Sequence, residues 1–161
     1  MTIRTENWNG YDIRFVEIGN EWWAILKDIC DALTLQTFKV SQRIPKQYLK
    51  KVLIESENKQ TAKGRRSSQK MLIINEVGIY QLFYTSRKAE AINFRAWSGE
   101  VMKKLRRKVG LESYSVMHML DTDVQESIND ILDTLFYDEE SGKLMQSVTV
   151  AGGDVDVVEF E

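Results

Sequence analysis

The sequence contains one cysteine, Cys30, and one histidine, His118, among its 161 residues. A single cysteine excludes an intrachain disulfide and C-x-x-C redox chemistry, and together the two residues are too few for a Cys/His zinc site. Cys30 lies among apolar residues, a setting that favours a small buried thiol over a nucleophile. The lack of disulfide chemistry is typical of proteins from a reducing compartment, so we predict a cytoplasmic location.

Long apolar stretches are also missing. No segment approaches the roughly 20 apolar residues of a membrane span, and the first ten residues, MTIRTENWNG, lack the apolar core of a signal peptide. The sequence therefore predicts neither membrane insertion nor secretion. Its apolar content of 43% is that of a soluble globular protein, and its length suits one domain with an appendage.

Charge is distributed very unevenly along the chain. Residues 1–110 carry 21 Lys and Arg against 11 Asp and Glu, a net charge of +10, whereas residues 111–161 carry 1 against 13, a net charge of −12. The overall charge of −2 hides this division. We predict a basic domain, 1–110, that binds a polyanion, and an acidic appendage, 111–161, with another role.

The first part of the chain predicts a β-hairpin followed by a short helix. Alternating apolar residues between 11 and 26 flank the turn dipeptide Gly19-Asn20. Trp22 and Trp23 are neighbours in the second strand and should point to opposite faces, so that one anchors the core. The alternative is an exposed tryptophan that stacks on a base. Residues 27–33 predict the helix.

A second hairpin is predicted where the positive charge is densest. The apolar runs 52–54 and 71–74 flank the polar segment ESENKQTAKGRRSSQK, and residues 39–70 carry ten Lys and Arg against two Glu. No acidic residue lies between Lys59 and Lys70, so we predict phosphate contacts from the tip of this hairpin. A solvated loop is the alternative. The predicted contacts come from Lys63, Arg65 and Arg66.

The segment 71–110 predicts two helices. Residues 77–83 suit a buried helix that ends at Thr85-Ser86, a pair that can cap the next helix. In the second helix, from Ala89, the apolar residues recur at intervals of three and four, and four cations gather on a separate face. Gly110 suits the helix end. The apolar face is Phe94, Trp97, Val101 and Leu105, and the cationic face is Arg95, Lys103, Arg106 and Arg107. A solvated face without function is the alternative.

The acidic end has regular patterns as well. Residues 122–137 predict a helix with an apolar stripe that includes Leu135 and Phe136, and residues 144–160 predict a hairpin with a turn at Gly152-Gly153. One helix and one hairpin are too small for a core of their own, so their apolar faces need cover. We favour a homodimer contact. Docking on the chain's own core and a flexible acidic tail are the alternatives.

With these residues in view, residues 11–110 resemble the N-terminal domain of the BRO family (Bro-N), which occurs in phage antirepressors and in large insect DNA viruses. The resemblance rests on WWAILKDICDAL at 22–33, INEVGIYQL at 74–82, SRK at 86–88, Glu90-Ala91, Phe94, Trp97, Glu100-Val101 and RRKVG at 106–110. The family usually has a proline where this chain has Ala89, and another before the final Ile-Arg. Here Lys103-Lys104-Leu105 replaces the second proline region, which lets the helix continue.

The resemblance implies a small α+β DNA-binding domain of β-hairpins and helices, to which this chain adds a C-terminal acidic helix plus β-hairpin. It also implies a phage or prophage regulator, in the cytoplasm of a bacterial host cell, that relieves repression by contacting DNA or a repressor protein. We expect Arg87 and Lys88, in the matched Ser-Arg-Lys, to approach double-stranded DNA most closely. The salt dependence of binding should be steep.

Capture of a phage repressor by the acidic segment is the alternative hypothesis, with carboxylates placed where DNA phosphates would lie. The acidic segment can also act as an internal competitor of the basic face. Catalysis is not predicted, because Asp121, Asp123, Asp130 and Asp133 share one helix without a histidine or another feature that would organise a metal. No cofactor and no membrane partner are predicted, whereas a homo-oligomer is.

Overall fold

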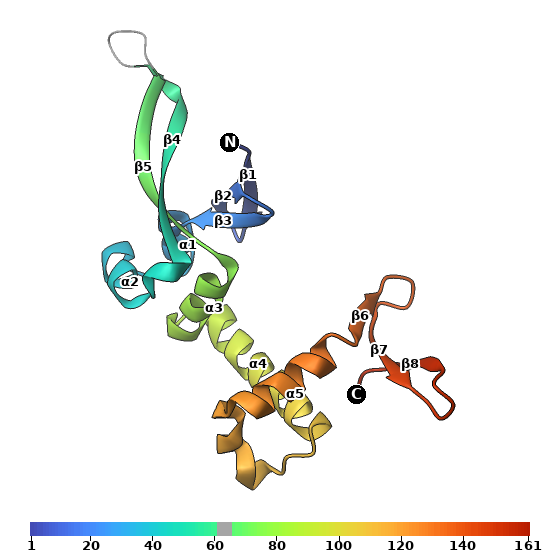
Figure 1. Ribbon diagram of the computed structural model, residues 1–161. Coiled ribbons are helices and arrows are strands. Elements are labelled where there is room, and N and C mark those ends of the chain that lie inside the picture. Colours follow the sequence, from blue (N-terminus) through green and yellow to red (C-terminus); the bar gives the residue numbers. More distant parts are fainter. Residues whose placement is uncertain (61–65) are drawn as a thin grey trace. The chain divides into compact units, whose positions relative to one another are not determined.

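The computed structural model describes the backbone of residues 1–60 and 66–161 and the side chains of residues 1–55 and 68–161. Two compact units are present, residues 1–95 and 96–161 (Figure 1). The helix α4, Ala89–Lys108, contributes residues to both. The boundary between the units lies within α4 and therefore precedes the change in charge at Gly110. The cations of α4 continue beyond this boundary to the end of the helix. A division of function at Gly110 stays a prediction.

A five-stranded antiparallel sheet organises the first unit, in the order β1-β2-β3-β5-β4. β3 is hydrogen-bonded to β5 rather than to β4, so the chain leaves the sheet after β3 and forms two helices before it returns. β4 and β5 continue as a long ribbon (Figure 1). The strands are β1 Ile3–Trp8, β2 Tyr11–Ile18, β3 Glu21–Ile25, β4 Leu49–Gln60 and β5 Arg66–Ile74, and the helices are α1 Leu26–Ala32, α2 Thr37–Arg43 and α3 Glu76–Thr85, with a short 3₁₀ helix, η1, at Lys46–Tyr48.

The predicted N-terminal hairpin is confirmed. β2 pairs with β3 around Gly19, whose φ of 64° lies in the left-handed region that favours glycine. Trp23 is 4% exposed and Trp22 is 37% exposed, so the two rings do point to opposite faces. β1 was not predicted, because its sequence IRTENW holds one aliphatic residue; pairing with β2 makes it a strand.

The core of the first unit lies where α1 and α3 meet the sheet. Leu26 of α1, Ile74 of β5 and Leu82 of α3 belong to one buried cluster and are at most 1% exposed. Cys30 is also fully buried there, and burial raises the pKa of its thiol. The thiolate is therefore disfavoured, which agrees with the predicted structural role of Cys30.

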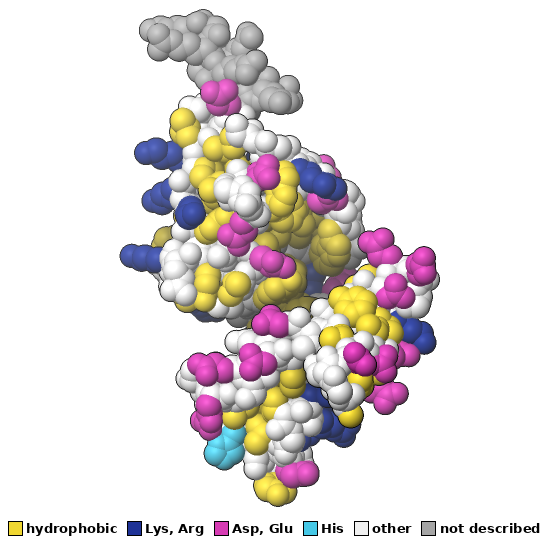
Figure 2. Space-filling model, turned by 45° about the vertical axis from the view of Figure 1, so that its right-hand side comes forward, with side chains coloured by type: hydrophobic (Ala, Val, Ile, Leu, Met, Phe, Trp, Pro, Cys, Tyr) yellow, Lys and Arg dark blue, Asp and Glu magenta, His cyan; other side chains and the backbone are white. Residues whose placement is uncertain are grey.

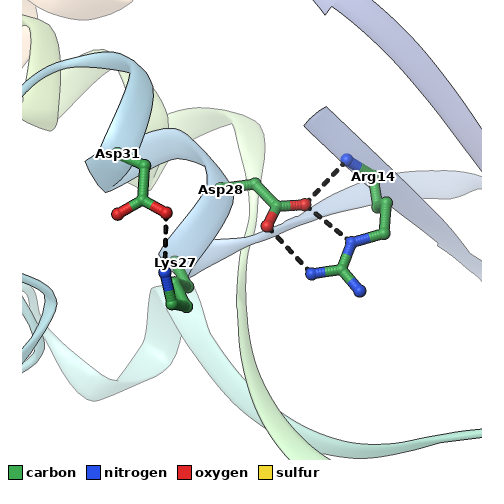
Figure 3. Close-up of polar contacts among 4 residues, drawn as sticks. All are labelled: Arg14, Lys27, Asp28 and Asp31. Carbon is green, nitrogen blue, oxygen red and sulfur yellow. Dashed lines mark hydrogen bonds and ion pairs between the residues drawn. The ribbon is translucent and has the colours of Figure 1, made fainter. Parts of the chain in front are cut away.

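A bidentate ion pair fixes α1 to β2. The guanidinium of Arg14 donates from Nε and NH2 to the carboxylate of Asp28, at 2.8 and 2.9 Å, and the backbone N–H of Arg14 donates to the same carboxylate at 3.1 Å (Figure 3). These hydrogen bonds raise the pKa of the Arg14 guanidinium. Three donors on one largely buried carboxylate set the position at which α1 leaves the sheet.

α3 begins at an Asn cap and approaches β5 closely. The side chain of Asn75 accepts a hydrogen bond from the backbone N–H of Gly78 at 3.0 Å. A Cβ on Gly78 would lie 2.6 Å from Cγ1 of Ile74, so only glycine lets the helix pack this tightly. The helix predicted over 77–83 is confirmed, but it is only partly buried, since Val77 and Tyr80 are 48% and 43% exposed. It ends at Thr85, just before the segment that carries Arg87 and Lys88.

In the second unit the end of α4 is followed by a 3₁₀ helix, a helix and three strands. Gly110, at φ 78°, ends α4 as predicted. The remaining elements are η2 Ser113–Leu120, α5 Thr122–Leu132, β6 Leu135–Asp138, β7 Lys143–Thr149 and β8 Val155–Glu159, and the strands form one antiparallel sheet in the order β6-β7-β8.

The prediction that the helix includes Leu135 and Phe136 is wrong, because both residues lie in β6. α5 ends at Leu132, and Leu135 and Phe136 pair with Gln146 and Met145 of β7. Cross-strand pairing overrides the helical spacing of these two residues. The predicted hairpin is confirmed as β7 and β8, and the α+β class holds for the chain.

Candidate nucleic-acid interface

A groove of about 570 Å³ opens on the first unit between α2 and the junction of α3 and α4. Its floor is apolar and includes the buried residues Leu33, Val40 and Leu82. Cationic side chains from two distant parts of the sequence line its walls. They are Lys39 and Arg43 of α2, and Arg87 and Lys88 between α3 and α4.

None of the described residues that line this groove is acidic. Lys39, Arg43 and Arg87 are exposed, and none of them forms an ion pair with another residue whose side chain the structure describes. The groove also presents polar side chains, those of Thr34, Gln36 and Thr85. Four cations without a neutralising carboxylate, beside neutral hydrogen-bonding groups, suit a phosphate backbone.

A buried serine holds the α3–α4 junction in place. Ser86 is fully buried; its hydroxyl donates to the carbonyl of Leu33 at 3.0 Å and accepts from the backbone N–H of Lys88 at 3.2 Å. The sequence predicted Thr85-Ser86 as a cap of the second helix; Ser86 instead ends α3, and its hydroxyl binds the backbone N–H of Lys88, the residue before α4. Because Leu33 lies in the loop before α2, the same hydroxyl joins the two walls of the groove.

Arg95 has a position that its sequence pattern did not predict. Its NH1 donates to the carbonyls of Phe83 and Ser86, at 3.0 and 2.7 Å. It thereby braces the junction that carries Arg87 and Lys88 from beneath. A phosphate contact by Arg95 stays a prediction, but its guanidinium already donates two hydrogen bonds to the protein's own backbone.

Lys88 lies beside two aromatic rings of the β1–β2 hairpin. Its Nζ is 4.7 Å from the centroid of Tyr11 and 5.5 Å from that of Trp8. Such contacts are worth about 0.5–1 kcal/mol at exposed sites. Lys88 is half-buried, whereas Arg87 is exposed. Of the matched Ser-Arg-Lys, Arg87 is therefore the freer side chain for an incoming phosphate.

The remaining cations predicted on the helix belong to the second unit and differ from one another. Lys103 and Arg107 are exposed. Arg106 is 7% exposed and donates to the carbonyl of Leu111, beyond the end of α4, so its guanidinium stabilises the helix terminus. Trp97 was predicted to pack but is 61% exposed, which corrects that prediction; Leu105, 5% exposed, is buried as predicted.

The predicted hairpin is present as β4 and β5, but most of its tip lies outside the described residues. This applies to Lys63 and Arg65, and to the side chain of Arg66, whose backbone begins β5. Lys51 and Lys70, lower on the ribbon, are exposed. Figure 2 shows Lys and Arg side chains along one flank of the first unit and many Asp and Glu side chains over the second.

Sequence reasoning missed Lys39 and Arg43 as site residues. Their i, i+4 spacing places them on one face of a helix, and that spacing was visible in the sequence. The sole proline, Pro45, lies two residues after Arg43 and interrupts the helical pattern, so no helix was predicted there. Neither spacing nor composition indicates that this face meets residues 87 and 88, because that contact depends on how α3 packs on the sheet.

Other chemistry receives little support from the described residues. Among them, no group of three or more His, Cys, Asp or Glu side chains is placed to hold a metal ion. The ring of His118 contacts the carboxylate of Asp121 at 2.6 Å in an exposed pair. Within the described part of the chain, no helix is both long and apolar enough to span a membrane.

The chain matches one family model, described as the BRO family, N-terminal domain, over residues 12–103. The match covers more than half of the chain and includes every described residue that lines the groove, from Leu33 to Lys88. No curated protein and no solved structure matches the chain.

Proposed function

The chain belongs to the BRO family through its N-terminal domain, and on this premise we propose that it binds duplex DNA through the basic groove of its first unit. At the level of the family it is a regulator of the phage antirepressor and DNA-binding type. The finer proposal is a phage or prophage transcription regulator that acts in the cytoplasm of a bacterial host cell. Catalysis forms no part of the proposal.

The single observation that carries this proposal is the convergence of four cations on one groove without a carboxylate among its described lining residues. Arg43 and Arg87 lie on opposite walls and come from segments more than forty residues apart. Because phosphate contacts position a protein on DNA without reading its sequence, the groove accounts for affinity and register rather than for specificity.

Further phosphate contacts are proposed outside the groove. They come from Lys63, Arg65 and Arg66, whose side chains lie outside the described residues, and from Lys103 and Arg107, which are exposed on α4. We expect these residues to add to affinity in the same salt-dependent way. Arg95 and Arg106 contribute less, because their guanidiniums already bind backbone carbonyls.

The test is duplex binding by the full-length protein over a series of salt concentrations. We expect log affinity to fall linearly with log salt, and Arg43→Ala or Arg87→Ala to weaken binding about 5- to 10-fold at low salt and to reduce the slope by roughly 0.9. Lys143→Ala, which removes the same charge on β7, is the matched control. A flat salt response, or groove variants that behave like the control, would refute the proposal.

We further propose that the second unit forms a homodimer through its sheet. None of the residues in β6, β7 and β8 is buried, although the described strands include Tyr137, Val155 and Val157, which are 64%, 68% and 48% exposed. A three-stranded sheet needs one covered face for stability in water. The surface that packs against this face must belong to a partner that is always present. A second copy of the chain meets that condition.

The packing of faces suits this dimer better than the pairing of edges. The outward N–H of Val157 on the edge strand β8 already donates to the carboxylate of Asp156 at 2.8 Å, which blocks part of the edge. Val155 and Val157 share one face. Val157→Asp should therefore lower the molar mass measured by light scattering to that of one chain, whereas Val150→Asp, in the turn before β8, should not. A monomeric wild-type protein would refute the homodimer.

Capture of a repressor protein is the alternative function, and one observation favours it. Four exposed carboxylates follow one another along α5 at intervals of three and four, on the side opposite the buried Ile128. They are Asp123, Glu126, Asp130 and Asp133. A stripe of this kind suits the cationic surface with which a repressor holds DNA. If capture is the function, replacing all four residues by the corresponding amides abolishes repressor binding without weakening DNA binding; retention of repressor binding would refute it.

A further inference from the structure

The short helix α2 presents four exposed side chains of two kinds. Lys39 and Arg43 line the basic groove, whereas Phe38 and Gln42, also exposed, do not. Val40, between them in sequence, is 7% exposed and belongs to the core. The helix therefore rests on its Val40 side and offers two adjacent rows to solvent, one cationic and one formed by an aromatic ring and an amide.

Both rows have the i, i+4 spacing of a helix, so their members lie about 5–6 Å apart at the Cβ atoms. The ring of Phe38 is 73% exposed, among the highest exposed fractions of the large hydrophobic side chains in the first unit. Its neighbour one turn later is Gln42, on the same row. An apolar ring is seldom this exposed to solvent. Beside a free amide and a row of cations, it forms a surface that suits nucleic-acid bases.

The chemistry of the second row matches one base pair in particular. A glutamine amide can bind N6 and N7 of adenine with two hydrogen bonds, and an apolar ring can contact the C5 methyl group of thymine. Both groups are displayed in the major groove. An α-helix with its side chains is about 10–12 Å across, so α2 can enter that groove, which is about 12 Å wide.

We propose that α2 reads A·T base pairs in the major groove, with Gln42 on adenine and Phe38 on the thymine methyl group, while the Lys39 and Arg43 row holds the adjacent backbone. This inference rests on the proposed function, since it requires that duplex DNA occupies the basic groove. It adds the residues that specify sequence, which the cationic groove does not supply.

The experiment is a selection from a randomised duplex pool with the full-length protein, followed by affinity measurements on the enriched site. The variants are Gln42→Ala and Phe38→Ala, and the control is Gln47→Ala, an exposed glutamine in the 3₁₀ helix after α2. A second duplex carries uracil in place of thymine, which removes the methyl group and leaves base pairing unchanged. Thermal unfolding of each variant confirms that these exposed substitutions leave the fold intact.

We expect the wild-type protein to enrich sites that contain A·T pairs. Gln42→Ala should lower affinity for the enriched site about 10-fold, as for the loss of one base contact, and leave affinity for random duplex unchanged. Phe38→Ala should bind the thymine and uracil duplexes equally, whereas the wild type prefers thymine. Gln47→Ala should behave as the wild type.

The outcomes separate the two proposals. If the wild-type protein binds no duplex, the proposed function fails and this inference fails with it. If it binds duplex with salt dependence but enriches no A·T site, or if both α2 variants retain the wild-type preference, the DNA-binding function stands and the assignment of α2 is overturned.

Discussion

The two units of this chain differ in the relation between charge and packing. The first, residues 1–95, carries 16 Lys and Arg against 10 Asp and Glu, and its sheet and helices enclose two clusters of buried residues. The second, residues 96–161, carries 6 against 14, and its buried hydrophobic residues, among those that the structure describes, are Leu105 and Ile128. A packed core holds the first unit's cations in a fixed geometry, whereas the second unit exposes both its carboxylates and its apolar side chains.

This difference explains why one unit offers a groove and the other offers a surface. A groove with four cations needs rigid walls, which Ser86 and Arg95 provide through bonds to backbone carbonyls. A sheet without a buried residue cannot hold a site by itself, but it can associate. Five cations of α4, between 103 and 108, belong to the acidic unit, so the sign of charge does not coincide with the structural division.

The greatest loss of stability should follow a core substitution in the first unit. Leu26→Ala in the first unit should lower the free energy of unfolding by about 2–5 kcal/mol, because Leu26 is fully buried and its neighbours cannot close the cavity. Ile128→Ala should cost less, about 1–2 kcal/mol, since its half-exposed surroundings can relax. Hydrogen exchange followed by mass spectrometry measures each unit separately. Equal losses of unfolding free energy in the two units would contradict the difference in packing between them.

Two glycines test the difference in packing at a single methyl group. Gly78→Ala in α3 should destabilise the protein by about 1–3 kcal/mol, because the new Cβ would meet Ile74 at 2.6 Å. Gly99→Ala in α4, where no atom lies within 4 Å of the new Cβ, should stabilise it by about 0.5–1 kcal/mol. Urea unfolding of both variants measures the two changes, and effects of the same sign would contradict the structure.

The opposite charges of the units predict a smaller effect on DNA binding. Replacement of Asp123, Asp130 and Asp133 by asparagine should raise duplex affinity about 2- to 5-fold at low salt, because fewer carboxylates then repel the phosphates. The gain should vanish near 1 M salt, where the Debye length is about 3 Å. Asn129→Asp, which adds a charge on the same helix, should act in the opposite direction. Electrophoretic mobility shifts measure both, and a gain that persists at high salt would exclude an electrostatic cause.

The smallest effect concerns the turn between β6 and β7. Hydrogen bonds from the hydroxyl and the backbone N–H of Ser141 lower the pKa of Asp138. The carboxylate therefore stabilises the turn above its unfolded-state pKa, and this contribution is lost as the pH falls through the lowered pKa in the folded protein. Asp138→Asn should slightly lower the melting temperature at neutral pH and leave it unchanged in strong acid. A difference that grows as the pH falls would refute this assignment.

Much of the fold followed from local patterns. Alternation around Gly19 predicted the β2–β3 hairpin, a dense apolar run without strict alternation predicted α3, and three- and four-residue spacing predicted α4 and α5. Gly110 ended α4 where a glycine was expected. These features depend on residues that are close together in the sequence, so the local sequence is sufficient to predict them. β6 was missed because Leu135 and Phe136 fit the helical stripe, and only their pairing with β7 shows that they form a strand.

The sequence predicted the chemistry of the candidate site, but it did not predict which residues form the site. The sequence determined that the chain is basic to residue 110 and acidic beyond it, and therefore which kind of partner each part attracts. The tertiary structure decided which cations are available, because packing of α3 on the sheet joins Arg87 to Lys39 and Arg43, while Arg95 and Arg106 turn to backbone carbonyls. Charge is a property of each residue, whereas exposure depends on contacts between residues far apart in the chain.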